Sequence, residues 1–126
     1  KNTIFTPNEK EFKLLLKNSN LKEEKLQKRM QDNVILRKGR IDQIYSKEEI
    51  KQNKSGAPRM TVAGTGDVLA GLVVGFVAQH KHNLFEVACA AAFISGKIGG
   101  KLQKQLGNGF LASDMLKEIA VTIKKY

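Results

Sequence analysis

A run of glycine and small residues that ends in a carboxylate lies near the middle of the chain. Ala63-Gly64-Thr65-Gly66-Asp67 leads directly into the apolar stretch 68–78. Glycines at such a junction let a ligand approach the backbone, and a helix that begins there exposes its first N–H groups. Those groups, together with the positive end of the helix dipole, favour a phosphate. Asp67 would then stand beside the phosphate as a candidate acid or base, although the alternative is that it only caps the helix.

Two further segments carry polar groups that could hold a ligand. Lys38-Gly39-Arg40 follows the apolar run 34–36, and open α/β sheets bind ligands at the carboxyl ends of their strands. Asn53-Lys54-Ser55-Gly56-Ala57-Pro58 is a polar loop shortly before the glycine run. Its amide and hydroxyl groups could contact a nucleotide. The alternative for both segments is an ordinary turn.

The elements that would position these residues follow from capping, turn and apolar patterns. We expect a strand at 1–5, then a helix with Thr6 as its N-cap, Pro7 in its first position and Glu9 completing a Thr-x-x-Glu capping box. A polar helix to about residue 31 and a strand at 34–36 follow. A second strand is expected over 41–45 and a third over 50–53. From residue 61 the pattern is helical, and the last helix starts near residue 112 with Ser113 as its N-cap. This alternation predicts an α/β layered architecture.

The stretch 68–79 is apolar on all sides, which predicts a buried helix. It is too short to cross a bilayer, which needs about 20 apolar residues. Gly71 and Gly75 share one face of this helix and predict close packing against a neighbouring element. Cys89 lies in a second apolar helix and is interpreted as a packing residue.

Composition is that of an ordinary globular chain of 126 residues with 41% hydrophobic residues. A single cysteine excludes an internal disulfide and, with no visible signal peptide or membrane span, predicts a cytoplasmic protein. The net charge of +10 raises nucleic acid as a partner. The charge is dispersed and lacks a zinc motif or an aromatic RNA-binding box, so we favour a basic solvated surface over a basic nucleic-acid-binding module, which remains a further alternative function.

Taken in order, these motifs resemble the ADP- or ATP-dependent NAD(P)H-hydrate dehydratases, which have a ribokinase-like fold. The resemblance covers nearly the whole chain, and its most specific part is the octet Gly-Thr-Gly-Asp-Val-Leu-Ala-Gly at 64–71. The other matching segments are Thr-Pro-x-x-x-Glu-Phe at 6–12, Leu-x-Lys-Gly at 36–39, Asn-x-Ser-Gly at 53–56, Met60, and Ala-Ser-Asp at 112–114.

The resemblance implies a repair enzyme that removes water from hydrated NADH or NADPH while ADP or ATP is hydrolysed, with Mg²⁺ as the metal. It implies that Asp67 contacts the hydrated cofactor as the catalytic acid/base. It also implies that Asn8 approaches the cofactor, at a position where many members carry histidine. The implied nucleotide-binding residues are Lys38, Gly39, Arg40, Ile41, Asp42, Asn53, Ser55, Gly56, Gly64, Thr65 and Gly66.

The length differs from that of the family, whose whole domains are about twice as long. Residues 1–126 are therefore interpreted as a single domain or as the C-terminal segment of a ribokinase-like domain that is incomplete at its N-terminus. We also expect a homo-oligomer. The glycine run alone would equally serve a vitamin or sugar kinase of the same fold, so a small-molecule kinase is the alternative function.

Overall fold

The computed structural model describes residues 2–57, 60, 62–80 and 83–126. Lys1, Pro58 and Thr61, which belong to predicted segments, lie outside the described residues. In chain order the elements are β1 (Ile4–Phe5), α1 (Glu9–Asn18), the short 3-10 helices η1 (Glu23–Lys25) and η2 (Gln27–Arg29), β2 (Val34–Arg37), β3 (Asp42–Tyr45), β4 (Ile50–Asn53), α2 (Thr65–Gln79), α3 (Leu84–Leu106), the 3-10 helix η3 (Gly107–Gly109) and α4 (Ala112–Ile123).

The strands form one mixed sheet in the order β1-β2-β3-β4. β1 runs parallel to β2. The short connections after β2 and β3 then make the remaining pairs antiparallel, with Leu36 opposite Ile44 between β2 and β3. The predicted α/β class is confirmed.

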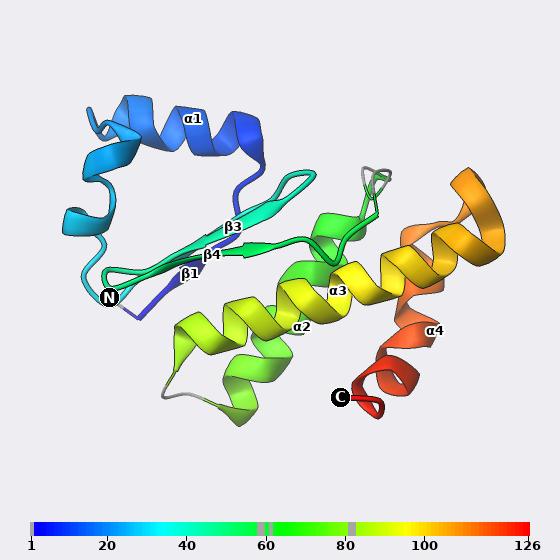
Figure 1. The fold of residues 1–126 in the computed structure, drawn as a ribbon. Coiled ribbons are helices and arrows are strands. Elements are labelled where there is room, and N and C mark those ends of the chain that lie inside the picture. Colours follow the sequence, from blue (N-terminus) through cyan, green and yellow to red (C-terminus); the bar gives the residue numbers. More distant parts are fainter. Residues whose placement is uncertain (1, 58–59, 61, 81–82) are drawn as a thin grey trace.

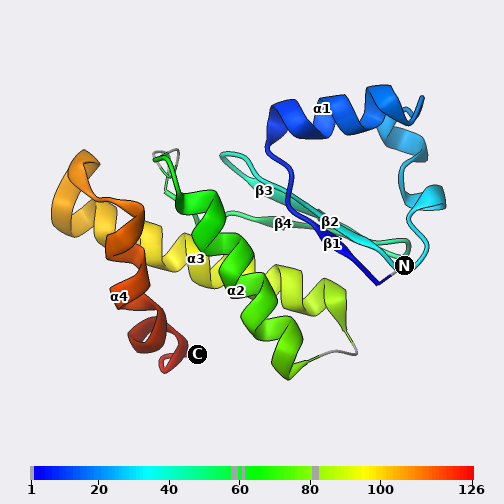
Figure 2. The same ribbon diagram turned by 180° about the vertical axis from the view of Figure 1, so that it is seen from behind.

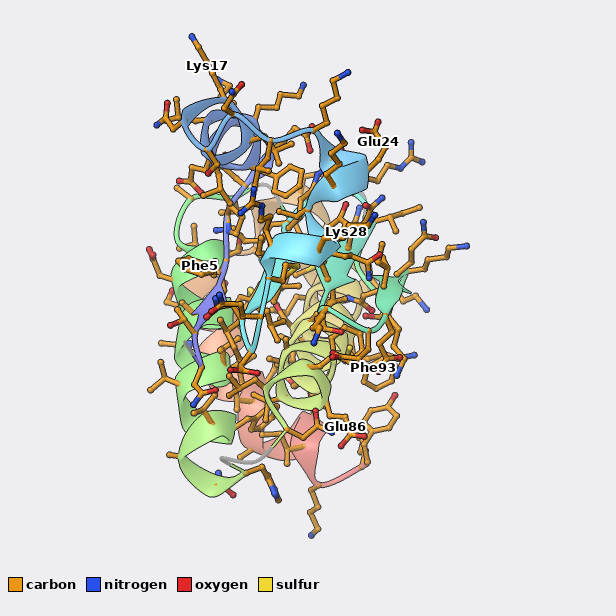
Figure 3. All side chains as sticks on the ribbon, turned by 90° about the vertical axis from the view of Figure 1, so that its left-hand side faces the viewer. Phe5, Lys17, Glu24, Lys28, Glu86 and Phe93 are labelled. Carbon is orange, nitrogen blue, oxygen red and sulfur yellow. The ribbon has the colours of Figure 1, made fainter. Side chains whose placement is uncertain are left out.

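The sheet separates two groups of helices (Figure 1). α1 and the 3-10 helices cover one face, and α2 and α3 cover the other, with α4 packed beyond them (Figure 3). The alternation of side chains along the strands explains both cores. Val34, Leu36 and Ile44 belong to the large core with α2, α3 and α4. Ile35 and Tyr45 belong to a smaller core on the α1 face, with Phe12, Leu26 and Met30.

The start of α1 differs from the prediction. Its N-cap is Asn8, whose Oδ1 accepts from the N–H groups of Lys10 and Glu11, and Glu11 completes the capping box by accepting from the Asn8 N–H. Thr6 is therefore not the N-cap. The physical reason is tertiary, because the Pro7 carbonyl accepts from the Lys38 N–H at 2.8 Å and keeps the preceding residues extended along the sheet.

Two other helix predictions are wrong. The polar segment to residue 31 is not one helix, because α1 ends at Asn18 and positive φ values at Asn20 and Gln31 bracket two short 3-10 helices. Those helices place Leu26 and Met30 in the smaller core. The N-cap of α4 is Leu111 rather than Ser113, since the Asp114 carboxylate accepts from the Leu111 N–H at 2.9 Å and the helix starts earlier.

One side of α2 is open, which contradicts its predicted burial on all sides. Val74 is 69% exposed, although Leu69, Leu72 and Val73 are buried against the sheet and α3. A Cβ placed on Gly71 or Gly75 would meet nothing within 4 Å, so the predicted close packing at these glycines does not occur in this chain. Figure 2 shows that α2 and the outer edge of β1 lie on the same side of the molecule.

One smaller feature agrees with the sequence. Cys89 is a half-buried thiol that packs beside the large core, and burial raises its pKa, as expected for a packing residue. Among the described residues, no helix is both long and apolar enough to cross a membrane.

Candidate active site

The predicted segments meet at a cavity of about 450 Å³ between the two layers of helices. It is bounded by the start of α1, the β2–β3 turn, the loop after β4, the first turn of α2 and the middle of α3. The predicted residues that line it are Asn8, Lys38, Gly39, Arg40, Asp42, Gly56, Thr65 and Gly66.

A positive charge lies at the glycine end of this cavity. A Cβ placed on Gly66 would lie only 3.0 Å from the Lys38 Nζ, so the ammonium passes directly over the first turn of α2. The hydrogen bond from the Lys38 N–H to Pro7 fixes the backbone from which this side chain extends. An ammonium next to the positive end of a helix favours an anion, and a phosphate fits both charges.

The first turn of α2 requires its glycine. Gly64 is the N-cap with φ +88°, a left-handed conformation that a side chain strains, and a Cβ there would lie 3.0 Å from the Ala112 Cβ of α4. Thr65 is buried and its hydroxyl donates to the carbonyls of Met60 and Val62 at 3.1 and 2.9 Å. The segment before the helix is thus held against its own first turn.

The β2–β3 turn is braced by a carboxylate. Asp42 Oδ1 accepts from the Gly39 N–H at 3.1 Å, and Oδ2 accepts from Asn53 Nδ2 at 3.0 Å. Burial raises the pKa of Asp42, and the hydrogen bonds from Asn53 and Gly39 and the charge of Lys38 oppose that shift. Asp42 therefore connects the turn that carries Lys38 to the loop after β4.

The loop after β4 is anchored on α3. Asn53 Nδ2 also donates to the Ala92 carbonyl at 2.9 Å, and the Ser55 hydroxyl donates to the Phe93 carbonyl at 3.1 Å. Asn53 Oδ1 accepts from the Ser55 hydroxyl at 2.7 Å, which closes the loop on itself. Asn53 and Ser55 thus shape the wall of the cavity without lining it.

Asp67 lies on a different side of the α2 N-terminus. It is exposed in the first helical turn and borders a separate groove of about 520 Å³ between α2 and α4, with Leu116 and Ile119. The residue immediately before it, Gly66, lines the 450 Å³ cavity. The first turn has no side-chain cap. Asp67 is therefore accessible beside the cavity rather than engaged as a capping group.

Some predicted residues stand apart, and some lining residues were missed. Ile41, Asn53, Ser55, Gly64 and Asp67 do not line the cavity; Ile41 is 43% exposed. The lining residues that were not among the predicted binding residues are Glu9, Ala57, Met60, Val62, Leu69, Ser95 and Gly96. Ser95 and Gly96 lie in the middle of an apolar helix, where no local pattern marks a site.

Two carboxylates line the cavity, and both are engaged with other protein groups. Within the described ranges, no group of three or more His, Cys, Asp or Glu side chains could hold a metal ion. Glu9 and Asp42 both line the cavity, but Glu9 pairs with Arg37 and Asp42 braces the turn. A Mg²⁺ ion that arrives with a nucleotide takes most of its ligands from phosphates and water.

Comparison with known proteins gives one consistent family. Residues 1–121 match the family model described as NAD(P)H-hydrate dehydratase. The chain is 38% identical over its full length to the ADP-dependent (S)-NAD(P)H-hydrate dehydratase of Nitrosopumilus maritimus and spans 46% of that protein. Over 85 residues it is 48% identical to the bifunctional NAD(P)H-hydrate repair enzyme Nnr of Methanothermobacter thermautotrophicus, of which it spans 16%.

Solved structures agree on the fold. A hypothetical protein from Streptococcus mutans superposes with a TM-score of 0.83 at 30% identity, over 97% of this chain and 46% of that one. A ribokinase-like superfamily protein from Enterococcus faecalis gives 0.82 at 28% identity, over 98% and 44%. The fold is ribokinase-like, and the chain spans less than half the length of these relatives.

Proposed function

The chain belongs to the NAD(P)H-hydrate dehydratase family, and from that premise we propose that the whole protein removes water from hydrated NADH or NADPH at the expense of ADP or ATP. The observation that carries the proposal is the Lys38 ammonium over Gly66, with Asp67 as the next residue. This arrangement offers an anion site and an accessible carboxylate within one helical turn.

The nucleotide would occupy the 450 Å³ cavity with its terminal phosphate at Gly66. The Lys38 ammonium and the N–H groups of the α2 N-terminus would stabilise the negative charge of the transferring phosphoryl group. Asn8 would donate from its Nδ2 amide to the cofactor, since its Oδ1 caps α1. Mg²⁺ would be held mainly by the phosphates and by water.

The reaction would then proceed in two steps. The ring hydroxyl of the hydrate attacks the terminal phosphorus, Asp67 accepts the hydroxyl proton, and AMP or ADP leaves. Phosphate is a better leaving group than hydroxide, so phosphate and a ring proton are lost and the double bond of the nicotinamide ring is restored. Positioning and charge stabilisation, which the cavity residues would provide, account for most of the catalysis in phosphoryl transfer.

We propose further that a longer polypeptide completes the domain over the open side of α2 and the outer edge of β1. An exposed edge strand and an exposed apolar helix face are normally covered in a stable fold. The relatives are more than twice as long as the matched chain, which supports this proposal. A homo-oligomeric state and a cytoplasmic location remain predictions.

The function is tested with Asp67→Asn in the full-length protein. Recovery of the absorbance of reduced nicotinamide from hydrated cofactor, dependent on ADP or ATP, is expected for the wild-type protein. Asp67→Asn should lower turnover by about 10²–10⁴-fold, because the amide accepts no proton at neutral pH. Nucleotide affinity and thermal stability should stay near the wild-type values, because the side chain of Asn has nearly the same volume as that of Asp.

Asp32→Asn is the matched control, because it removes an exposed carboxylate before β2, whereas Lys38 follows that strand. The control should keep wild-type turnover. Near wild-type turnover in Asp67→Asn would remove Asp67 from the mechanism. Absence of recovery with either nucleotide in the folded wild-type protein would reject the proposed function itself.

A further inference from the structure

The middle of α3 supports the loop after β4 at a position that has no side chain. Gly96 is buried there and lines the cavity together with Gly56 of the loop after β4. The two anchoring hydrogen bonds of that loop go to the carbonyls of Ala92 and Phe93, in the helical turn before Gly96. The loop therefore rests on a patch of α3 whose centre has no side chain.

The space at Gly96 is fully taken by the loop backbone. A Cβ placed on Gly96 would overlap the Ser55 hydroxyl and would lie 2.8 Å from both the Gly56 nitrogen and the Ser55 carbonyl carbon. A side chain could rotate away from such an overlap, but a backbone segment has to move as a whole. By contrast, a Cβ on Gly100, one turn later, would make an ordinary 3.8 Å contact with the Ser55 carbonyl oxygen.

A shift of the loop would reach the β2–β3 turn. Asn53 connects the Ala92 carbonyl on α3 to the Asp42 carboxylate, and Asp42 in turn holds the Gly39 N–H. Gly39 directly follows Lys38, whose ammonium lies over Gly66. One chain of hydrogen bonds thus runs from α3 to the charge at the phosphate end of the cavity.

We propose that Gly96 is a positioning residue for the nucleotide. Its missing side chain lets the segment 53–56 seat on α3, and this seating sets both the loop wall of the cavity and, through Asp42, the turn that carries Lys38. The inference rests on the proposed binding of ADP or ATP in this cavity. It assigns to α3 a role in nucleotide affinity.

The test is Gly96→Ala in the full-length protein, measured in two ways. Calorimetric titration with ADP and with ATP should show at least a tenfold loss of affinity. Hydrogen exchange without nucleotide should show faster exchange of the amides of 53–57. The melting temperature should fall, because the overlap with backbone atoms forces the loop to move, although alanine is favoured over glycine in a helix. A purely structural role would lower the melting temperature in the same way but leave the affinity of the folded protein unchanged.

Gly100→Ala is the matched control. It lies in the same helix and gains the same helix propensity, but there is room for its Cβ. It should keep wild-type affinity and exchange. Ser55→Ala adds a second check, because it removes the hydrogen bond from the Ser55 side chain to α3. In the Ser55→Ala background, Gly96→Ala should cause a smaller further loss of nucleotide affinity than it causes in the wild type, so the two effects should not be additive.

The outcomes separate the two proposals. Faster loop exchange with unchanged affinity, or equal affinity losses in Gly96→Ala and Gly100→Ala, would overturn the positioning role. If the wild-type protein binds ADP or ATP and Gly96→Ala weakens that binding but no hydrate is repaired, the positioning role stands and the proposed reaction fails.

Discussion

At the scale of single residues, the candidate site depends on charges brought to one helix terminus from distant parts of the chain. The Lys38 ammonium reaches the first turn of α2 from the end of β2. The backbone of Gly66 can be approached because it carries no side chain. Asp67 follows in sequence but faces another groove. A phosphate contact and a proton acceptor are therefore held by the same helical turn on different sides.

Lys38→Met is expected to weaken ADP and ATP binding about 10- to 100-fold, the worth of one charge-assisted hydrogen bond of about 1.5–3 kcal/mol. Titration calorimetry at fixed ionic strength measures this change in affinity. Lys17→Met removes the same charge from an exposed position near the end of α1, labelled in Figure 3, and should bind like the wild type. Equal losses in the two variants would mean that net charge, rather than contact at Gly66, determines the affinity.

At the scale of elements, one arginine joins α1 to the sheet. Arg37 on β2 pairs with Glu9 at 2.7 Å and with Glu23 at 2.9 Å, and its guanidinium lies 4.7 Å from the centre of the Phe12 ring. The Tyr45 hydroxyl also donates to Glu23, and burial, followed by that bond, raises the pKa of Tyr45 to about 12. These contacts hold the N-terminus of α1 beside the turn that carries Lys38.

From the ion pair between Arg37 and Glu9 we expect a specific loss of stability in acid. The hydrogen bond with Arg37 lowers the pKa of Glu9 below its usual 4.5. A lowered pKa means that the ion pair stabilises the fold above about pH 4.5, and that this contribution disappears as the pH falls through the folded-state pKa. Glu9→Gln should lower the free energy of unfolding at neutral pH by about 1 kcal/mol or less and flatten its decline below pH 4.5.

Denaturant unfolding across the acid range measures this effect. The control is Glu24→Gln, which removes an exposed carboxylate from η1 next to Glu23, labelled in Figure 3. It should retain the wild-type pH dependence. The same decline below pH 4.5 in Glu9→Gln and in the wild type would show that the Arg37 pair does not contribute to acid stability.

The sequence predicted correctly those elements that are determined by neighbouring residues. The strand at 34–36 and the helix behind the glycine run were predicted correctly, because apolar runs and the left-handed Gly64 act over a few residues. The N-cap of α1 was not, since the Pro7 carbonyl and the Glu9 carboxylate both find partners about 30 residues away. Ser95 and Gly96 were missed for the same reason, because their role exists only once the loop after β4 lies against α3.

At the scale of the whole molecule, two surfaces on one side are not covered by another element among the described residues. The outer edge of β1 has no strand partner among the described residues. The neighbouring side of α2 exposes Val74 and has open space at Gly71 and Gly75. An apolar groove of about 660 Å³, lined among others by Phe76, adjoins the C-terminal end of the same helix. Glycines four residues apart allow a second backbone to approach closely, so this side of α2 suits a packed element.

Val74→Asp in the full-length protein tests the proposal that a longer polypeptide covers this side. A buried aspartate without a partner should lower the free energy of unfolding by about 2 kcal/mol or more, with a matching fall in melting temperature. Leu14→Asp is the control, since Leu14 is 55% exposed on α1, across the sheet from α2 (Figure 1). Its effect should stay within about 0.5 kcal/mol, as for an exposed site. Equally small effects would mean that Val74 remains exposed to water in the whole protein, and the proposed covering of α2 would then be rejected.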